Sequence, residues 1–431
     1  MPAPDVRGCV QEAEWLRRYY EAVNPAWIDT MQALGLPTHF VRAKNLQLWT
    51  PQRHVVHDMV AGFGSAIFGH APQDLVGVLR VAIGAELPNV LVYGAHPVAA
   101  TVAGELLSLA PGSLEKVHFC NDGSQAIDSA LKFAAIATQR CEFVSMKDGF
   151  HGLSVGATAL AGGGPWRQGL PSIGPRVRRL DIRDWDAIER CLSKRRTAAI
   201  VIEVVQSSGV VPAWSRDALL RLQALCRETA TLVIVDEVMT GLGRTGRWFA
   251  YEEGGREFEP DLVTLSKSLS AGLLPVAAVM MTTPIYEAVF LPPGHAKIHG
   301  STFSGNRVGL MLAEAVMRRL RAEKACEHVS RVGRLLERRL NDLANNDLIG
   351  APVGRGLLQA FEVVSHGRRM SRAESALRCL SGLLARGWLT LPAGHSKGHL
   401  RIMPPYTIQA EQVIGFVDAL EDTVRDPATW R

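Results

Sequence analysis

A lysine and a carboxylate, each placed at the end of an apolar run, are the residues of this sequence best suited to chemistry. Asp236 ends the run Leu-Val-Ile-Val-Asp at 232–236, and Lys267 follows the run at 262–266. Buried parallel strands give such runs, and α/β proteins bind ligands at the carboxyl ends of these strands. A lysine there can hold pyridoxal phosphate as a Schiff base, while the carboxylate keeps the pyridine nitrogen protonated so that the ring accepts electrons. We therefore expect pyridoxal 5′-phosphate as the cofactor, with Lys267 and Asp236 as the catalytic residues.

The stretch 121–126, Asn-Asp-Gly-Ser-Gln-Ala, has the composition of a phosphate-binding helix start. It follows a short apolar run and opens a helical pattern, so backbone N–H groups of the first turn are available to an anion. Gly123 allows a close approach, and the hydroxyl of Ser124 adds a donor. An ordinary helix cap made by Ser124 alone is the simpler interpretation. In a chain that also has Asp236 and Lys267, we favour the phosphate site.

Two further side chains can be interpreted with or without a ligand. Phe150 follows the strand expected at 142–146 and could stack on a pyridine ring, although a phenylalanine is more often part of a core. Arg401 lies in the apolar stretch 399–406 and could clamp a carboxylate with two nitrogens. A structural ion pair explains such an arginine equally well, and the residues alone leave both interpretations open.

The elements that would position these residues alternate along the chain. Helical periodicity is found near 74–86, 98–110, 124–138, 184–195 and 216–229. Apolar strand-like runs are found at 117–120, 142–146, 198–204, 232–236, 262–266 and 276–281. This alternation, with several runs that lack period-two polarity, predicts an α/β fold: a doubly wound, mostly parallel central sheet with helices on both faces.

The two ends of the chain have a different pattern. Residues 12–35 suit amphipathic helices, and residues 46–60 are typical of a hairpin around Pro51. A long helical pattern runs from 308 to 345 with a break expected near Lys324, and short strands and helices follow it.

This pattern predicts two domains. We expect a large cofactor-binding domain over residues 61–310. A smaller α+β domain would consist of an N-terminal segment over 1–60 and a C-terminal part over 311–431.

Composition favours a soluble enzyme over a nucleic-acid-binding protein. The 431 residues are 47% hydrophobic and 21% charged, and the net charge of +5 is spread along the chain. Arginine-rich spots at 176–179, 194–196 and 318–321 look like solvated surface, and no stacking aromatics interleave with them. We expect no binding of nucleic acid.

Cysteine usage and hydropathy favour the cytoplasm. The seven cysteines form no Cys-x-x-Cys pair and their number is odd, which fits free thiols in a reducing compartment and argues against a zinc site or disulfide scaffold. The N-terminus has no apolar signal core, and no apolar run reaches membrane-spanning length. We expect a cytoplasmic protein without a metal or membrane partner.

Together these stretches resemble the class III aminotransferases, pyridoxal phosphate enzymes of fold type I that include ornithine, acetylornithine, 4-aminobutyrate and ω-amine transaminases. The block 232–246 carries most of the resemblance, with Lys267 and Gly272 behind it. The resemblance implies that Lys267 forms the Schiff base, that Val238 packs under the cofactor ring and that Phe150 stacks above it. The cofactor-binding residues that it implies are Gly123, Ser124, Phe150, His151, Glu203, Asp236, Val238, Met239, Lys267 and Thr302.

The segment 299–306 bears on oligomeric state. It looks like the family segment whose threonine reaches the phosphate of the neighbouring subunit's cofactor. Thr302 therefore implies a homodimer with two shared active sites.

The chain departs from the family pattern at three positions. Met239 stands where a glutamine commonly bonds the cofactor's phenolic oxygen, and a thioether cannot donate. Ser208 replaces the glutamate that pairs with the carboxylate-binding arginine in the ornithine and 4-aminobutyrate enzymes, so Arg401 is expected to lack that partner. Gln125 replaces the usual glutamate of the phosphate motif.

The expected function is ping-pong transamination between an amine or amino acid and a keto acid. Lys267 would act as general base and acid. The resemblance implies that Arg401 and Trp49 bind substrate, with Phe68 and Trp166 also lining the pocket. An aminomutase or amino-acid racemase would use the same lysine, and a non-catalytic binding protein could keep the same fold. A dinucleotide-dependent dehydrogenase is disfavoured, because no Gly-x-Gly-x-x-Gly follows the first strand.

Overall fold

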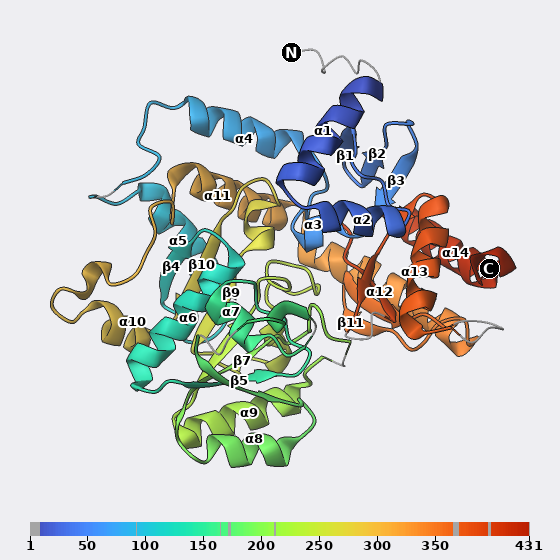
Figure 1. The fold of residues 1–431 in the computed structure, drawn as a ribbon. Helices are drawn as coiled ribbons and strands as arrows, with labels where there is room; N and C mark the ends of the chain where they lie inside the picture. The colour runs from blue at the N-terminus through green and yellow to red at the C-terminus, as the bar shows by residue number, and fades with distance from the viewer. Residues whose placement is uncertain are drawn as a thin grey trace.

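The computed structural model describes residues 9–91, 93–163, 165–170, 174–210, 213–364, 370–394 and 398–430. Within these residues the central sheet has seven strands in the order β4-β10-β9-β8-β7-β5-β6 (Figure 1). They are β4 (Lys116–Cys120), β5 (Glu142–Met146), β6 (Arg176–Leu180), β7 (Thr197–Ile202), β8 (Leu232–Asp236), β9 (Leu262–Leu265) and β10 (Ala277–Met281). Strands β5 to β9 pair in parallel, and β10 is antiparallel to both neighbours. The expected mostly parallel sheet is confirmed.

Both faces of this sheet are buried. Val233 and Val235 of β8 belong to a core cluster that includes Leu219 of α9 (Arg216–Thr229). Ile234, between the two valines, belongs to a second cluster with Ile127 of α6 (Gly123–Thr138). Successive side chains of a strand point to opposite faces, so the unbroken apolar run of β8 reflects helices on both sides.

The remaining helices of this part cover the sheet and its edges. They are α3 (Ala61–Gly64), α4 (Gln73–Gly84), α5 (Pro97–Leu109), α7 (Val155–Leu160), α8 (Trp185–Leu192), α10 (Thr283–Phe290) and α11 (Arg307–Ala322), with the 3-10 turns η1 (Pro165–Arg167), η2 (Ala250–Gly254), η3 (Lys267–Ser270) and η4 (His295–Lys297). α11 packs against α4 and α5. Residue Lys324, with a φ of 48°, separates α11 from α12 (Ala325–Asn345), so the break expected in the long helical pattern is confirmed.

The arginines at 176–179 are not simply solvated surface, which corrects the interpretation from sequence. They form β6, an edge strand paired with β5. Arg179 Nε donates to the carbonyl oxygen of Ala161 at 2.9 Å, and its guanidinium also donates to Ala159. Charged side chains are common on edge strands because they discourage pairing with other chains, and they hide the apolar signal that identifies a strand.

Two smaller sheets lie beside the large one, each with four strands among the described residues. The first has the order β1 (Arg42–Lys44), β2 (Gln47–Trp49), β3 (Val55–Asp58) and β13 (Trp388–Leu389). The second has the order β11 (Val353–Arg355), β12 (Leu358–Glu362), β15 (His399–Ile402) and β14 (Leu391–Ala393). The β2–β3 hairpin expected around Pro51 is confirmed, and β3 also pairs in parallel with β13, which joins the two ends of the chain.

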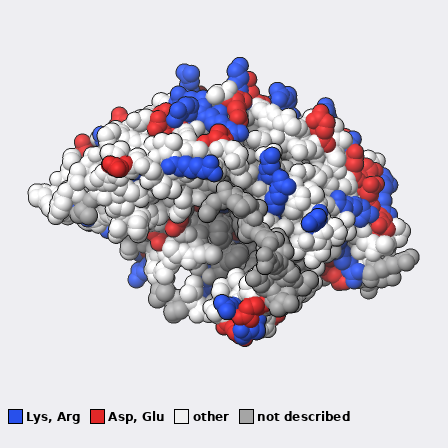
Figure 2. All heavy atoms as spheres, turned by 90° about the horizontal axis from the view of Figure 1, so that it is seen from above, with Lys and Arg blue, Asp and Glu red and all other residues white. Residues whose placement is uncertain are grey.

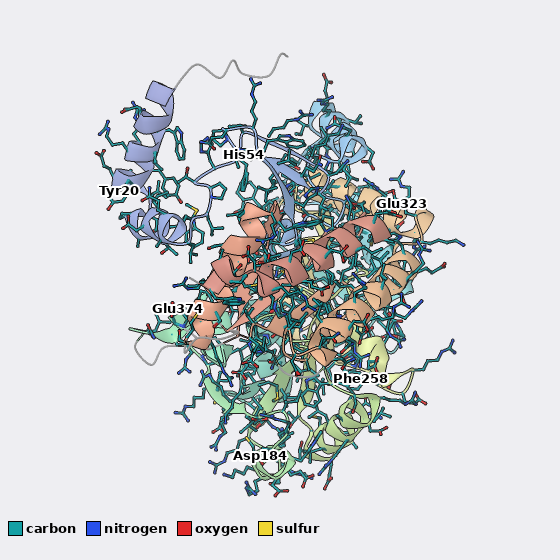
Figure 3. The ribbon with its side chains drawn as sticks, turned by 90° about the vertical axis from the view of Figure 1, so that its right-hand side faces the viewer. Tyr20, His54, Asp184, Phe258, Glu323 and Glu374 are labelled. Carbon is teal, nitrogen blue, oxygen red and sulfur yellow. The ribbon has the colours of Figure 1, made fainter. Side chains whose placement is uncertain are left out.

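The terminal helices surround these small sheets (Figure 1). They are α1 (Cys9–Ala22), α2 (Pro25–Ala33), α13 (Arg372–Ala385), α14 (Ala410–Arg425) and the 3-10 turn η5 (Pro427–Trp430). Figure 3 shows Tyr20 on α1 at one corner of the molecule and Asp184, which caps α8, at the opposite end.

The surface seen in Figure 2 mixes basic and acidic side chains without a continuous area of one sign. The cysteines whose side chains the structure describes are free thiols. Among the helices of the described ranges, none combines the length and apolar character needed to cross a bilayer.

Candidate active site

Asp236 is the last residue of β8 and is held at three points. It lies opposite Thr264 of β9, whose hydroxyl donates to Asp236 Oδ1 at 3.2 Å. The backbone N–H of Val238 donates to the same oxygen at 3.0 Å, and Asp236 Oδ2 lies 2.8 Å from His151 Nδ1. The carboxylate therefore sits at the carboxyl edge of the sheet with its orientation fixed. Sequence reasoning missed Thr264, whose signal is its position three residues before Lys267.

His151 is a buried histidine whose ring is bonded to Asp236. Burial opposes its charge, but the hydrogen bond to Asp236 and the negative charges of Asp236 and Glu203 raise the pKa of the imidazole. Because carboxylate oxygens only accept, His151 Nδ1 donates to Asp236. Its Nε2 has no hydrogen-bond partner among the described residues.

Lys267 begins η3, and Ser266 alone separates it from the end of β9. Burial lowers the pKa of its amine to about 8. Asp236 and Glu203 oppose this shift, while Arg244 and Arg401 add to it. The hydrogen-bond contact of Nζ is the Sδ atom of Met239 at 3.7 Å, and a thioether is a weak acceptor. The amine is therefore available for covalent chemistry.

Met239 fills an apolar space beside this amine. It belongs to a small core cluster with Val205, Leu358 and Met403. Gly64, with a φ of 76°, approaches so closely that a Cβ atom there would lie 3.0 Å from Met239 Sδ. The departure at this position from the family's glutamine thus places sulfur next to the lysine.

The helix start at Gly123 and Ser124 forms a cradle. The side chain of Asp122 caps α6 by accepting the N–H of Gln125, which leaves the N–H groups of Gly123 and Ser124 for a ligand. A Cβ atom at Gly123 would lie 2.8 Å from Val238 Cγ1. Ser124 Oγ accepts the N–H of Leu153 at 3.1 Å and keeps its own hydrogen for donation.

Lys267 and the two residues before the cradle line a common cavity. A cavity of about 280 Å³ is lined by Asn121, Asp122, Ser266, Lys267 and Gly272, among others. The lysine amine and the residues that precede the helix start are therefore neighbours, as an aldehyde cofactor with a phosphate group requires. These residues fit pyridoxal phosphate.

Glu203 connects Phe150 to the loop after β7. Its Oε2 accepts the N–H of Phe150 at 3.0 Å, and its Oε1 accepts the N–H of Ser207 at 2.9 Å. Burial raises the pKa of Glu203, and the nearby His151 opposes this. The ring of Phe150 meets Trp166 edge to face at 5.5 Å. Glu203 thus holds the aromatic side chain through its backbone.

Arg401 is buried, and backbone carbonyls take the place of a carboxylate. Its Nη1 donates to the oxygen of Gln206 at 2.8 Å, and its Nη2 donates to Gly209. Burial lowers the pKa of the guanidinium to about 10, although Glu203 opposes the shift. Within the described part of the chain, no carboxylate forms an ion pair with this guanidinium. The lack of a glutamate partner expected from Ser208 stays a prediction.

Three other expected residues lie apart from these contacts. Trp49 of β2 is half-buried, with the guanidinium of Arg42 4.6 Å above its ring. Phe68 belongs to the main core, with Arg319 over its ring. Thr302 is exposed.

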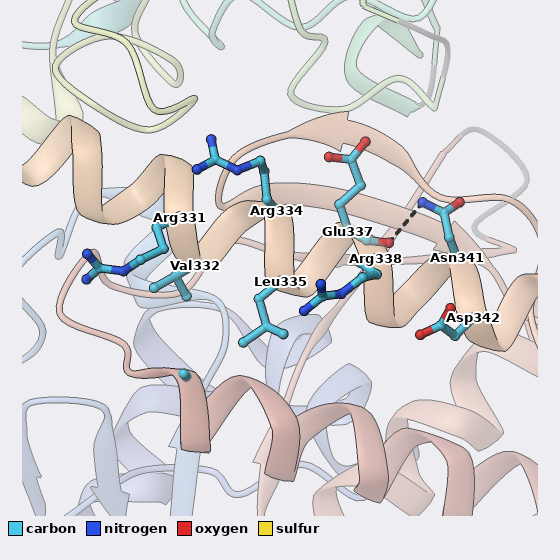
Figure 4. Close-up of a pocket in the computed structure, with 9 residues that line it drawn as sticks. Arg331, Val332, Arg334, Leu335, Glu337, Arg338, Asn341 and Asp342 are labelled. Carbon is cyan, nitrogen blue, oxygen red and sulfur yellow. Dashed lines mark hydrogen bonds between the residues drawn. The ribbon is translucent and has the colours of Figure 1, made fainter.

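A larger cavity of about 760 Å³ lies along α12, away from this chemistry (Figure 4). Its lining includes Arg331, Arg334 and Arg338, with Asn341 donating to the carbonyl oxygen of Glu337. None of the expected site residues lines it. Volume alone does not identify the active site.

A half-buried lysine, a carboxylate and a helix start that meet at the carboxyl edge of a mostly parallel sheet define a pyridoxal phosphate-dependent enzyme of fold type I. Comparisons with known proteins agree. The family model described as aminotransferase class III matches residues 31–424.

Relatives of known name are also similar to this chain. The acetylornithine aminotransferase of Aquifex aeolicus is 30% identical over 397 residues, which cover 90% of this chain and 97% of that protein. The aminotransferase PigE of Serratia sp. is 32% identical over 349 residues, which cover 80% of this chain but 41% of PigE.

Solved structures show the same fold. The ornithine aminotransferase from Toxoplasma gondii has a TM-score of 0.81 at 25% identity, covering 96% of this chain and 97% of that one. The ω-transaminase from Pseudomonas jessenii has a TM-score of 0.81 at 24% identity, with coverage of 91% and 93%, and shows the fold alone.

The chain belongs to the class III aminotransferases. The family, the fold, the pyridoxal phosphate cofactor and aminotransferase activity expected from the sequence are confirmed.

Proposed function

We propose that this aminotransferase works by a ping-pong mechanism in which Lys267 and Asp236 carry the chemistry. The donor would be an amine or amino acid and the acceptor a keto acid. The observation that carries the proposal is the state of Lys267: a half-buried amine, with its pKa lowered to about 8, that shares a cavity with Asn121 and Asp122 before the helix start.

The residues that would hold the cofactor come from the strand ends and the helix start described above. Lys267 would hold it covalently through Nζ, and Asp236 would face the pyridine nitrogen. Gly123 and Ser124 would bind the phosphate, with Val238 and Phe150 on the two ring faces. When bound, pyridoxal phosphate draws electrons from the carbon next to the substrate nitrogen, so that a proton there becomes acidic.

Lys267 would then move that proton. Its neutral Nζ accepts the proton from the carbon beside the substrate nitrogen and, as an ammonium, returns it on the other side of that nitrogen. The lowered pKa keeps both forms of the amine within reach near neutral pH. Return of the proton to the opposite face of the original carbon would instead give racemisation.

Asp236 would keep its orientation throughout these steps. His151, Thr264 and the N–H of Val238 all donate to it, so its negative charge stays fixed at the ring nitrogen. Glu203 would likewise fix Phe150 above the ring through the backbone N–H.

Arg401 would receive the carboxylate of the keto acid, and Trp49 would border the substrate. A guanidinium held by carbonyl oxygens alone gains from a negatively charged partner. Substrate carboxylate would therefore replace one or both of those contacts.

Two copies would form a homodimer with shared active sites. The exposed Thr302 supports this, because a residue expected to bind phosphate is open to solvent in a single subunit and would be covered by a second one. The free thiols support a reducing, cytoplasmic location. The large domain would span 61–310, with 1–60 and 311–431 in the small one.

A single-turnover absorbance experiment tests the proposal. Purified protein loaded with pyridoxal phosphate is mixed with a panel of amines and amino acids in the absence of keto acid. We expect the absorbance band of the lysine-bound cofactor to convert to that of pyridoxamine phosphate with some donors. Lys267→Ala should abolish turnover and leave the fold and phosphate binding intact.

Other outcomes would contradict the proposal in distinct ways. A donor that perturbs the band without leaving pyridoxamine phosphate would support a racemase or mutase. Near-normal activity of Lys267→Ala would remove the lysine from the mechanism.

A further inference from the structure

The segment between η4 and α11 is fastened to helix α6 by side chains. Lys132 Nζ donates to the carbonyl oxygen of Ile298 at 2.7 Å. The imidazole of His299 lies 2.7 Å from the hydroxyl of Ser129. These two contacts dock residues 298–299 on one face of the helix.

A third contact lies at the start of α6. Asn121 Nδ2 lies 2.6 Å from Ser301 Oγ and donates to it. Asn121 stands two residues before Gly123, so the segment is tied to the same turn that forms the phosphate cradle. The helix start and the segment therefore form one unit.

His299 is held by packing as well as by its hydrogen bond. Its ring meets Phe133 edge to face at 5.2 Å and lies 5.3 Å from the ring of His118. Ser129 gives its hydrogen to the carbonyl oxygen of Gln125 at 2.6 Å, so His299 Nε2 donates to the Ser129 hydroxyl. Burial, assisted by the charge of Lys132, lowers the pKa of His299.

The two residues that follow these anchors are exposed in the single subunit. Thr302 is exposed, and Phe303 is 62% exposed despite its apolar side chain. Three anchors thus end one residue before an outward-facing hydroxyl. A segment that is anchored up to residue 301 and exposed at the next residue is suited to contact with another molecule.

We propose that His299 and Ser301, held by Ser129 and Asn121, are positioning residues that present Thr302 to the cofactor phosphate of a second copy of the chain. The inference rests on the shared active sites of the proposed function. It adds that the anchors act across the interface: they belong to one subunit and serve the cofactor of the other.

The physical reason is the cost of ordering a loop. A hydroxyl on a free segment must lose backbone freedom when it binds, whereas an anchored segment has lost that freedom on folding. Loss of one neutral hydrogen bond of about 1 kcal/mol should therefore weaken cofactor binding by about fivefold.

Mixed dimers test the direction of this effect. One chain carries Lys267→Ala and the other carries Thr302→Ala, so that one site combines an intact lysine with the Thr302 of the opposite chain. The cofactor is removed, and the affinity of that site for pyridoxal phosphate is measured by titration of the lysine-bound absorbance band. This readout does not depend on turnover.

His299→Phe is then placed on either chain. The phenyl ring keeps the packing on Phe133 and loses the nitrogen that bonds Ser129. On the Lys267→Ala chain, which supplies Thr302, we expect affinity to fall by about fivefold. On the Thr302→Ala chain we expect a change of less than about twofold, because that segment serves the site without a lysine.

Two results would overturn the inference. Equal losses with His299→Phe on either chain, or a larger loss on the lysine-bearing chain, would make the anchors ordinary structural contacts. If the mixed dimer binds cofactor no more tightly than the Thr302→Ala homodimer, Thr302 does not act across the interface, and the shared site fails with it. Ser304→Ala is the matched control, since Ser304 Oγ donates within the segment to Ser301 and not to α6.

Discussion

Asp236 Oδ2 and His151 Nδ1 lie 2.8 Å apart, and each residue is only 4% exposed. The two are separated by 85 positions in the chain. A buried carboxylate needs donors on both oxygens, and here His151 supplies one of them while Thr264 and the N–H of Val238 supply the other. The histidine therefore stabilises the charge of Asp236, which we propose faces the nitrogen of the cofactor ring.

Replacement of His151 by alanine should reduce kcat/KM by roughly 10- to 100-fold, because a hydrogen bond to a charged group contributes about 1.5–3 kcal/mol. The fold and the phosphate cradle do not depend on this bond, so cofactor should still be retained. Steady-state kinetics with absorbance of the bound cofactor provides the measurement. His151→Gln, whose amide can donate to Asp236, should recover part of the loss. Equal activity of all three proteins would show that the pair is not needed.

The lowered pKa of Lys267 predicts how cofactor attachment depends on pH. Burial lowers the pKa from 10.5 to about 8, so the neutral, nucleophilic amine is depleted below pH 8 and prevails above it. The rate at which cofactor-free protein forms the lysine-bound absorbance band should rise about tenfold per pH unit up to about pH 8 and then level off. Stopped-flow mixing with pyridoxal phosphate measures it. A rise that continues to pH 10 would mean that the amine keeps its ordinary pKa.

Arg401 should discriminate between acceptors that differ only in a carboxylate. Pyruvate differs from acetone only in having a carboxylate in place of one methyl group. Arg401→Gln should lower the pyruvate-to-acetone ratio of kcat/KM by roughly 10- to 100-fold, as expected for the loss of a charged hydrogen bond of about 1.5–3 kcal/mol.

The variant Arg401→Lys serves as the control for this discrimination. It keeps the charge but not the planar fork and should fall between the two proteins. If both acceptors lose activity equally, the arginine only supports the segment that contains Gln206 and Gly209.

The cradle should fail when Gly152 acquires a side chain. Gly152 has a φ of 123°, and an added Cβ atom would overlap the hydroxyl of Ser124. Gly152→Ala should weaken cofactor affinity by about tenfold or more, because displacing Ser124 and straining the backbone together exceed about 1.4 kcal/mol. A fluorescence titration of cofactor-free protein measures the affinity.

Gly35→Ala is a control that introduces backbone strain without any steric overlap. Gly35 also has a positive φ, of 64°, but a Cβ atom there meets nothing within 4 Å. This control should lower the free energy of unfolding slightly and leave cofactor affinity unchanged. The prediction is wrong if both variants bind cofactor as the unmodified protein does.

The sequence by itself predicted six of the seven described strands of the central sheet and singled out Asp236 and Lys267 as the candidate catalytic residues. Unbroken apolar runs such as 232–235 specify strands buried on both faces, and Asp236 and Lys267 stand out because charged residues close to the ends of such runs are rarely buried. These signals are local, since they depend on side-chain periodicity within a few residues. The arginine-rich edge strand β6 escaped the same reasoning because its local pattern is polar.

Tertiary structure alone decided which distant residues meet. The partners of Asp236 at His151, of Arg401 at Gln206, and of His299 at Ser129 lie 85, 195 and 170 positions apart in the chain. No periodicity records such pairs, because they depend on the path of the whole chain and on which strand ends and loops share an edge of the sheet. Local sequence therefore specified the chemical groups, and the packing of the complete chain specified the contacts that orient them.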